Sequence, residues 1–250
     1  MAELAGPGAD TAHVWWARRQ DASDRHAGLL DETERQRWAA YRRDEDRERF
    51  GVGVALAKTV LAGYAGLRPV DVRFDRTCPQ CGRPHGKPVF KVSALSHSVT
   101  HSGDLVAVAV ARTPVGVDVE QLDGRARPLG GDGDTQALAR LVLADDEQAT
   151  LAAVGPSART REFLAAWTRK EAVTKATGDG LRVSFRDVVI VTDEGAPRLV
   201  AWPYPQPPES VSLLDLETAP GYVAALAVLG RCDTVRARDG SALLAAPAAA

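Results

Sequence analysis

The sequence has little of what would direct it to a membrane, a nucleic acid or an oxidising compartment. Its 250 residues carry a formal net charge of −2 at pH 7, which argues against a general nucleic-acid binder. Three cysteines in a chain of this length do not make a disulfide framework, which fits a reducing compartment. No apolar run is long enough to cross a bilayer, and the N-terminus has no charged segment followed by an apolar core. We therefore expect a cytoplasmic globular protein whose partners include neither a membrane nor a nucleic acid.

Lysine is also scarce, because arginine supplies most of the basic residues. This bias makes each remaining lysine mildly informative. Hydrophobic residues make up 45% of the chain and charged residues 26%, which is enough apolar material for one large core or two smaller ones. The lysines are Lys58, Lys87, Lys91, Lys170 and Lys175.

A helix is predicted over residues 163–178. Apolar residues recur there at helical spacing, and Gly178 stands where a left-handed C-cap would end the helix. Trp167, Glu171 and Lys175 are each four residues apart, so they share one stripe of that helix. A carboxylate and an ammonium on one stripe are commonly a surface ion pair of little energetic weight. They can also hold a metal ion and the phosphates that it neutralises, and a second acidic element would favour that interpretation.

The segment 115–120 is such an element. Its strict alternation predicts a strand with valines on one face and with Asp118 and Glu120 on the other. Two carboxylates on one face repel each other, and a bound cation makes their proximity favourable. With Glu171 they make three hard oxygen ligands, a set that suits Mg²⁺ and the phosphates of a substrate.

Together the two motifs resemble those of a known family. Gly-x-Asp-x-Glu at residues 116–120, followed by Trp-x-x-Lys-Glu-x-x-x-Lys at 167–175, is similar to the signature of the 4′-phosphopantetheinyl transferases of the Sfp type. Those enzymes activate the carrier proteins of polyketide and nonribosomal-peptide synthetases. The resemblance covers about residues 30–228. It implies transfer of the 4′-phosphopantetheine arm of coenzyme A to a serine of an acyl or peptidyl carrier protein, with release of 3′,5′-ADP.

The resemblance also implies the parts of a reaction site. Mg²⁺, or Mn²⁺, would be held by Asp118, Glu120 and Glu171, with coenzyme A as the co-substrate. Lys175 would lie beside the metal and neutralise the pyrophosphate. Glu171 is the candidate base for the serine hydroxyl, directly or through a metal-bound water.

For the phosphates of coenzyme A the resemblance points to several basic residues. Arg49 matches best by position and Arg37 less well, while Lys87 lies in a Gly-Lys-Pro turn that the family places near the phosphates. Lys170 is about 100° off the stripe of Lys175 and either contacts a phosphate or is solvated. Glu147 matches a family glutamate that lies near the site.

A histidine motif occurs twice and only one copy is assigned to the site. The copy at residues 100–103 contains the family's glycine and is followed directly by an apolar run. We therefore expect His101 to reach the 3′-phosphate and Thr100 to contact the pyrophosphate. His97, in the other copy, is expected in an exposed loop.

The predicted fold class is α+β. Helical patterns cover residues 29–67, as two helices, and residues 137–154. A first strand is expected at residues 14–17, and later β-rich runs are expected to form one antiparallel sheet. Those runs are 181–185, 188–191, 198–202, 211–216 and 222–228.

The resemblance implies two similar subdomains in a pseudo-twofold, pseudo-dimeric arrangement. Each would have a long helix packed on a small, mainly antiparallel sheet, and coenzyme A would lie in the cleft between them. A chain with two fused halves of this type implies a monomer. We place the subdomains at residues 13–112 and 113–230, with residues 1–12 and 231–250 as disordered tails.

A Cys-x-x-Cys motif with a histidine four residues later leaves two interpretations open. Cys78, Cys81 and His85 have the spacing of half a zinc knuckle. A second ligand pair is missing, since Cys232 lies near the end of the chain. The spacing therefore favours a tight turn that contains thiols over a structural zinc site.

The polar segment 122–136 is predicted to be a mobile loop close to where the acceptor protein docks. Carrier proteins usually present an acidic helix, which Arg125 or Arg127 would meet. Two other functions remain open at this point. One is a carboxylate–Mg²⁺ phosphohydrolase that acts on a nucleotide, and the other is a non-catalytic interaction domain that contains zinc.

Overall fold

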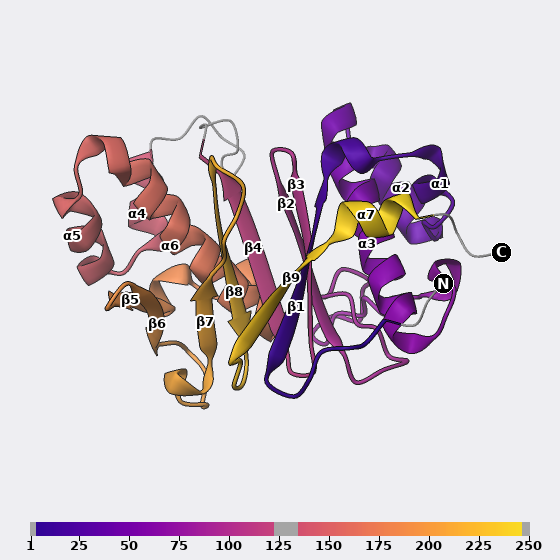
Figure 1. Cartoon of the computed structure of the whole chain (residues 1–250). Helices are drawn as coiled ribbons and strands as arrows, with labels where there is room; N and C mark the ends of the chain where they lie inside the picture. Colours follow the sequence, from indigo (N-terminus) through magenta and orange to yellow (C-terminus); the bar gives the residue numbers. More distant parts are fainter. Residues whose placement is uncertain (1–3, 123–134, 247–250) are drawn as a thin grey trace. The chain divides into compact units, whose positions relative to one another are not determined.

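The computed structural model describes residues 4–122 and 135–246. Internal contacts divide the chain into two compact units, one of residues 1–113 with 233–250 and one of residues 114–232. Each unit combines a long helix with small, mainly antiparallel sheets, which confirms the predicted α+β class (Figure 1). The pseudo-twofold relation between the units stays a prediction. None of the described helices combines the length and the apolar character needed to span a membrane.

The first unit is built on a four-stranded sheet with the strand order β2-β3-β1-β9. Strand β3 pairs antiparallel with both β1 and β2, whereas β9 runs parallel to β1. Two helices are found where two were predicted, and they are α2 and α3. The elements are β1 (Thr11–Arg18), α1 (Asp24–Ala27), α2 (Glu32–Ala40), α3 (Asp44–Ala65), β2 (Ser96–Ser102), β3 (Leu105–Ala111), β9 (Thr234–Asp239) and α7 (Gly240–Ala245).

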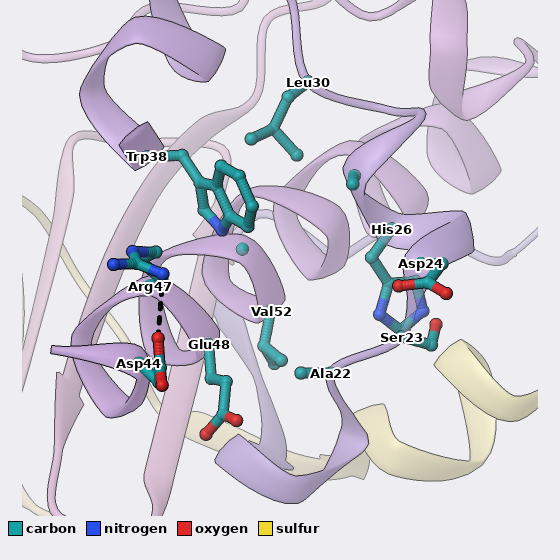
Figure 2. Close-up of a pocket in the computed structure, with 12 residues that line it drawn as sticks. Ala22, Ser23, Asp24, His26, Leu30, Trp38, Asp44, Arg47, Glu48 and Val52 are labelled. Atoms are coloured by element: carbon teal, nitrogen blue, oxygen red, sulfur yellow. Dashed lines mark hydrogen bonds and ion pairs between the residues drawn. The ribbon is translucent and has the colours of Figure 1, made fainter. Parts of the chain in front are cut away.

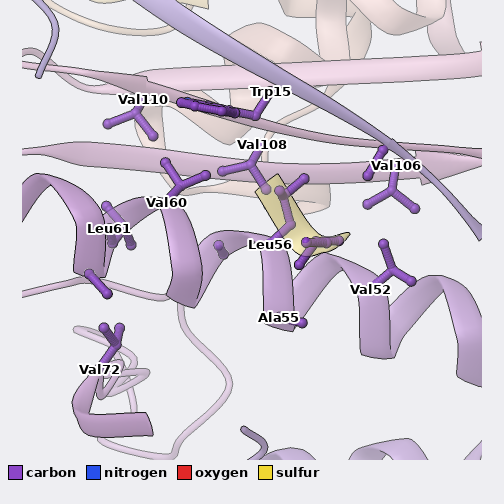
Figure 3. Packing of buried hydrophobic residues seen from close by; sticks show 14 of the residues in the cluster. Trp15, Val52, Ala55, Leu56, Val60, Leu61, Val72, Val106, Val108 and Val110 are labelled. Atoms are coloured by element: carbon purple, nitrogen blue, oxygen red, sulfur yellow. The ribbon is translucent and has the colours of Figure 1, made fainter. Parts of the chain in front are cut away.

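Helix α3 forms the core of this unit because its second half is almost entirely apolar. Residues 51–63 are all buried, and the helix ends at Gly66, whose φ of 66° is a left-handed conformation that favours glycine. Figure 3 shows one face of the helix packed against the valines of β3 and against Trp15 of β1. Lys58 is the exception, and its Nζ forms a fully buried ion pair with Glu34 at 2.6 Å.

The predicted tails at both ends of this unit are wrong for the described residues. Strand β9 adds to the sheet beside β1, and α7 follows it, with Leu244 buried in the core. Asp239 caps α7, since its Oδ1 accepts a hydrogen bond from Ala242 N at 2.8 Å. Near the other end, Leu4 N donates to Gly63 O at 3.0 Å. The sequence did not indicate β9, because arginines and an aspartate interrupt it and no run of apolar residues marks the strand.

The second unit has a three-stranded antiparallel sheet, β4-β8-β7, and a separate hairpin of β5 and β6. One sheet was predicted from these runs, and that was wrong. A tight turn at Glu194 and Gly195, both with positive φ, closes the hairpin locally. The elements are β4 (Val115–Gln121), α4 (Thr135–Val142), α5 (Asp145–Ala153), α6 (Pro156–Thr177), β5 (Val189–Asp193), β6 (Ala196–Ala201), β7 (Ser212–Asp215) and β8 (Tyr222–Val228).

Two further differences from the prediction concern local structure in this unit. Residues 181–185 form no strand, because short 3₁₀ turns at Gly180–Arg182 and Phe185–Asp187 interrupt the run. Phe185 packs instead against Trp167 of α6, with ring centroids 5.2 Å apart. The single helical stretch predicted at residues 137–154 is two helices, α4 and α5. By contrast, α6 ends at Gly178 with a φ of 87°, as predicted.

Candidate functional site

Asp118 on strand β4 and Lys175 on helix α6 are the centre of the candidate site in the second unit. Lys175 Nζ lies 2.6 Å from Oδ1 of Asp118 and donates to the carbonyl oxygen of Val117 at 3.3 Å. Asp118 is only 4% exposed. Two motifs that stand 57 residues apart in the sequence therefore meet in space.

Gly116 allows the helix to come this close to the strand. A Cβ at residue 116 would lie 2.0 Å from the carbonyl oxygen of Ala172 and 2.5 Å from the amide nitrogen of Ala176. Side chains alternate along a strand, so Asp118 and Glu120 point to the same face as Gly116, toward α6. The glycine of the sequence motif thus has a packing role that brings the carboxylates to the helix.

Three carboxylates act on Lys175. Burial alone lowers the pKa of Lys175, but the charges of Asp118 and Glu171 outweigh that effect, helped by the hydrogen bond to Asp118, and the pKa is raised. Glu120 adds a smaller contribution in the same direction. The pKa of Glu171 is raised chiefly by burial, against the opposing charge of Lys175, and the charge of Asp118 raises it further. Lys175 therefore stays an ammonium at neutral pH, and Glu171 holds a proton more readily than a surface glutamate does.

The chemical type of the three ligands suits a hard divalent cation. Asp118, Glu120 and Glu171 offer carboxylate oxygens, the ligands that Mg²⁺ prefers. Among the described residues, three ligand atoms within 4.8 Å of one another are found at Cys78, Cys81 and His85 of the first unit, and not at these carboxylates. To share one ion, the three carboxylates would have to come closer together than they lie here.

Lys170 does not have the predicted role, because its side chain is 0% exposed. Its Nζ lies 2.5 Å from Glu147 Oε2 and donates to the carbonyl oxygen of Phe185 at 2.8 Å. Glu147 is held in turn by the amide nitrogens of Ala144 and Ile190, at 2.7 and 2.9 Å. The prediction that Lys170 binds a phosphate or is solvated was therefore wrong. Its position off the stripe turns it into the interior, toward α5.

In the first unit, Arg49 and His101 lie near the same turn. Arg49 donates to the carbonyl oxygen of Gly103 at 2.8 Å, in the turn between β2 and β3. It lies one helical turn before Gly53, whose Cβ position would be 3.2 Å from Val99 of β2. Because Val99 and His101 share a face of β2, His101 is on the α3 side of the sheet and is exposed there. The guanidinium and the imidazole thus lie on facing elements.

Thr100 points to the other face of the sheet and is buried. Its hydroxyl and the ring of His101 therefore cannot reach one phosphate from the same face. Arg37 is exposed on α2, with its guanidinium 5.8 Å from the ring centroid of Phe50. Phe50 directly follows Arg49 on α3, so Arg37 lies over the residue next to Arg49.

The prediction for His97 was wrong. His97 is 4% exposed, lies within β2, and has its ring centroid 4.8 Å from that of Phe74. Burial lowers the pKa of His97 to about 3, and the positive charges of Lys87 and Arg76 lower it in addition. Burial likewise lowers the pKa of Lys87 to about 8. Arg76, whose charge acts on His97, also forms an ion pair with Glu34 at 3.3 Å. Its partly buried position could not be predicted, because nothing in its local sequence distinguishes it from the many solvated arginines.

Most of the predicted loop, residues 122–136, lies outside the described residues, as do Arg125 and Arg127. Helix α4 begins at Thr135, within the predicted loop. Two hollows in the described part of the chain are lined by residues other than the predicted site residues. Figure 2 shows the one in the first unit, with a volume of about 330 Å³, where Trp38, His26 and Glu48 line the wall. The other, in the second unit, has a volume of about 420 Å³ between α4, α5 and the start of α6.

The second unit, and with it most of the chain, is similar to one family of known proteins. Residues 114–227 match the model of the 4′-phosphopantetheinyl transferase superfamily. The chain is 32% identical over 191 residues to 4′-phosphopantetheinyl transferase HetI of Nostoc sp., which covers 74% of this chain and 73% of that one. It is 24% identical over 163 residues to 4′-phosphopantetheinyl transferase Sfp of Bacillus subtilis, with 65% and 66% covered. A crystal structure of a holo-(acyl-carrier-protein) synthase from Bacillus anthracis in complex with CoA (3′,5′-ADP) matches at 23% identity and a TM-score of 0.38, over 46% of this chain and 94% of that one.

Proposed function

Because the chain belongs to the 4′-phosphopantetheinyl transferase superfamily, we propose that it transfers the 4′-phosphopantetheine arm of coenzyme A to a serine of a carrier protein. The product nucleotide is 3′,5′-ADP, and the acceptor is an acyl or a peptidyl carrier protein. The observation that carries the proposal is the 2.6 Å contact between Lys175 and Asp118, beside Glu171 on the same helix. This contact joins the two sequence motifs on one surface.

The reaction moves a phosphorus atom from one oxygen to another. The serine oxygen attacks the phosphorus that carries the pantetheine arm, and the bond from that phosphorus to the bridging oxygen breaks. The bridging oxygen leaves with 3′,5′-ADP and takes the electron pair of the broken bond. A base must accept the serine proton, and positive groups must stabilise the charge that develops on the leaving phosphate.

Glu171 meets the need for a base, and Lys175 meets the need for a positive group. Lys175 neutralises the diphosphate, and it stays charged because the neighbouring carboxylates raise its pKa. Glu171 is the candidate base that accepts the serine proton. Both side chains project from the same stripe of α6, so the base and the cation have a fixed separation along the helix.

Magnesium, or manganese in its place, is the cofactor that the three carboxylates fit in kind. Asp118, Glu120 and Glu171 would hold it, once their carboxylates come closer together than they lie here. When bound, such an ion supplies Lewis-acid neutralisation of the diphosphate oxygens. Lys175 would remain beside Asp118 and share that neutralisation.

The first unit contributes contacts to the rest of coenzyme A in this proposal. His101 takes the 3′-phosphate, and Arg49, which faces the same turn, adds a positive group. Lys87 takes another phosphate oxygen. Thr100, on the opposite face of β2, serves a different part of the molecule. The chain acts as a cytoplasmic monomer in this proposal.

The test is incubation with coenzyme A, Mg²⁺ and an apo carrier protein, followed by intact-mass measurement of the carrier. The expected result is a mass gain of one phosphopantetheine arm. A carrier whose acceptor serine is replaced by alanine should gain nothing. The variant Glu171→Gln should be slow with an intact carrier, and near-normal turnover would exclude Glu171 as the base.

The same assay separates the proposal from a nucleotide phosphohydrolase. A hydrolase would release a nucleotide product when the carrier protein is left out, whereas a transferase should release 3′,5′-ADP only when an acceptor serine is present. Absence of carrier modification across several acyl and peptidyl carriers would contradict the proposed function.

A further inference from the structure

A set of metal-ligand side chains in the first unit has no part in the transfer reaction. Sγ of Cys78, Sγ of Cys81 and a ring nitrogen of His85 all lie within 4.8 Å of one another. Nε2 of His85 is 2.9 Å from Sγ of Cys81, so the ring points directly at the thiol. We propose that these three side chains bind a zinc ion, and that the ion holds the loop that carries Lys87.

The backbone forms a tight turn around the two cysteines. Cys78 N donates to Arg83 O at 2.8 Å, and Gly82 N donates to Cys78 O at 2.9 Å. Gly82 has a φ of 72°, a left-handed conformation that a residue with a side chain rarely adopts. These bonds fold the chain back on itself, so that both thiols project to the same side of the turn.

Gly86 then brings His85 onto the cysteines. Gly86 N donates to Arg76 O at 2.7 Å. A Cβ at residue 86 would lie 3.0 Å from the carbonyl oxygens of Arg76 and Thr77 and 3.2 Å from Cys78 Cα. The returning chain therefore passes directly against the backbone that begins the turn, which a larger residue would prevent. The spacing of the cysteines and the histidine in the sequence does not reveal this close contact between the two backbone segments.

The base of the segment is closed independently of any metal. Asp75 and Val89 form an isolated antiparallel bridge, with N–O distances of 2.9 and 2.8 Å. Because the bridge already brings the ends of the segment together, the entropy that an ion must overcome to order the ligands is small. The ligand set is thus largely formed before the metal binds.

Zinc is the ion that suits these ligands. Thiolate and imidazole are soft and borderline donors, which favour zinc over magnesium or calcium. Zinc bonds of about 2.3 Å to sulfur and about 2.0 Å to nitrogen in a tetrahedron put the two ligand atoms roughly 3.5 Å apart. His85 therefore needs to move outward from Cys81 by only a fraction of an ångström. Within the described ranges no fourth residue of a ligand type joins the set, so we assign the fourth position to water.

The role of the ion rests on the proposed function, because Lys87 is the proposed phosphate contact. Lys87 follows His85 by two residues, so an ion bound at His85 limits how far Lys87 can move. Loss of the ion would remove one constraint on this end of the segment, while the backbone hydrogen bonds of the turn and the bridge at its base remain. The binding of 3′,5′-ADP should then weaken, although Lys87 and the other proposed phosphate contacts are still present.

Metal content of the purified full-length chain tests the site itself. After exposure to zinc and desalting, the wild type should contain one zinc per chain. Cys81→Ser and His85→Ala, both at exposed positions, should each lose it. Cys232→Ser removes a thiol outside the set and should keep the zinc, and circular dichroism of every variant shows that it is folded. Zinc that is absent from the wild type, or that persists in both ligand variants, would overturn the site.

A thiol count distinguishes the zinc site from a disulfide. Denatured, chelator-treated wild type should show three reactive thiols, one for each cysteine of the sequence. A count of one, with the mass of an intact disulfide between Cys78 and Cys81, would overturn the proposal. Substitution of zinc by cobalt should add a thiolate-to-metal absorption band that Cys81→Ser lacks, and an identical spectrum in the two proteins would contradict thiolate ligation.

Binding of 3′,5′-ADP, measured by calorimetry, tests the role of the ion. Zinc-loaded wild type should bind several-fold more tightly than chelator-stripped wild type, and Cys81→Ser should bind weakly whether or not zinc is added. Lys87→Gln should bind weakly while it retains zinc. Affinity that is equal with and without zinc would overturn the positioning role. Stoichiometric zinc in a chain that binds no 3′,5′-ADP at all would instead contradict the proposed function and leave the zinc site standing.

Discussion

The ammonium of Lys175 lies 2.6 Å from the carboxylate of Asp118, which is almost fully buried on strand β4. The pair links helix α6 to the sheet of the second unit, and it also forms the centre of the proposed reaction site. A buried carboxylate that loses its cation destabilises the fold, whereas a cation beside a diphosphate contributes to catalysis. The two contributions can be separated by experiment.

Lys175→Met should reduce both stability and activity. It removes the positive charge beside a buried carboxylate, which costs about 3 kcal/mol or more when such a pair is broken. It also removes one electrostatic group from the transition state, which typically lowers kcat by about 10²–10³-fold. Urea unfolding and the rate of carrier modification measure the two effects.

The double variant Asp118→Asn with Lys175→Met shows whether the effects have separate origins. Removing the carboxylate's charge should recover much of the stability that Lys175→Met loses, because no buried anion then remains at residue 118. Activity should stay low, since neither the lysine nor the carboxylate proposed to hold the metal is present. Recovery of activity together with stability would mean that Lys175 and Asp118 have only structural roles.

Glu147→Ala should destabilise the second unit without affecting coenzyme A binding. The substitution leaves the ammonium of Lys170 buried beside Phe185 O, and it removes the acceptor of two amide hydrogen bonds. Loss of one member of a buried ion pair costs about 3–5 kcal/mol. The free energy of unfolding in urea and the KM for coenzyme A, measured at low temperature where the variant stays folded, check this expectation.

Glu162→Ala is the matched control for that substitution. Glu162 is exposed on the same helix as Lys170, so its removal should change the free energy of unfolding by only about 0.5 kcal/mol. A large rise in KM for coenzyme A in Glu147→Ala, with little loss of stability, would support the discarded idea that Lys170 contacts a phosphate.

The candidate site was predictable from sequence where periodicity alone determines which residues share a face. Alternation along β4 gave the face shared by Asp118 and Glu120, and four-residue spacing gave the stripe of Glu171 and Lys175. Lys170 could not be placed in this way. Its partner Glu147 is on another helix, α5. The position of Lys170 around the axis of α6 does not show which face of α6 that helix covers.

The errors in the first unit have the same physical origin. His97 precedes a polar run, which indicates a loop, yet the run pairs with β3 residue by residue. Strand β9 alternates small or apolar residues with arginines, and only its partner β1 makes it a strand. Pairing between distant segments decides both cases, and neither carries a local signal for that pairing.

Gly116→Ala should move α6 away from β4 and so open the contact of Lys175 with Asp118. The added methyl group would lie 2.0 Å from a carbonyl oxygen of the helix, and backbone cannot yield as a flexible side chain does. We expect a loss of about 1–3 kcal/mol, as for other overpacked sites, and a fall in kcat beyond what partial unfolding explains. Gly155→Ala, at the N-cap of the same helix with open space around it, should leave kcat unchanged. Equal rates in the two variants would contradict the packing role.

Stability should fall as the pH is lowered from neutral, because two buried histidines of the first unit resist protonation. Burial lowers the pKa of His97 to about 3 and that of His13 to about 4, from an ordinary value of 6.5. Between the lowered and the ordinary values, the unfolded chain binds protons that the folded chain does not. The free energy of unfolding therefore rises with pH in this window, by up to about 1.4 kcal/mol per pH unit for each histidine. The full contribution is present above pH 6.5 and is lost progressively below it.

His97→Gln isolates one of these contributions, since it keeps a polar side chain of similar size and removes the titration. Urea unfolding of the wild type and the variant should be compared at several pH values between 4.5 and 7.5, a range chosen to span the ordinary histidine pKa. Any difference between the variant and the wild type that comes from packing against Phe74 is the same at every pH. Below about pH 6 the variant's free energy of unfolding should decline less steeply than that of the wild type. Parallel curves would mean that His97 becomes protonated as easily in the folded chain as in the unfolded one, which its burial beside Lys87 and Arg76 opposes.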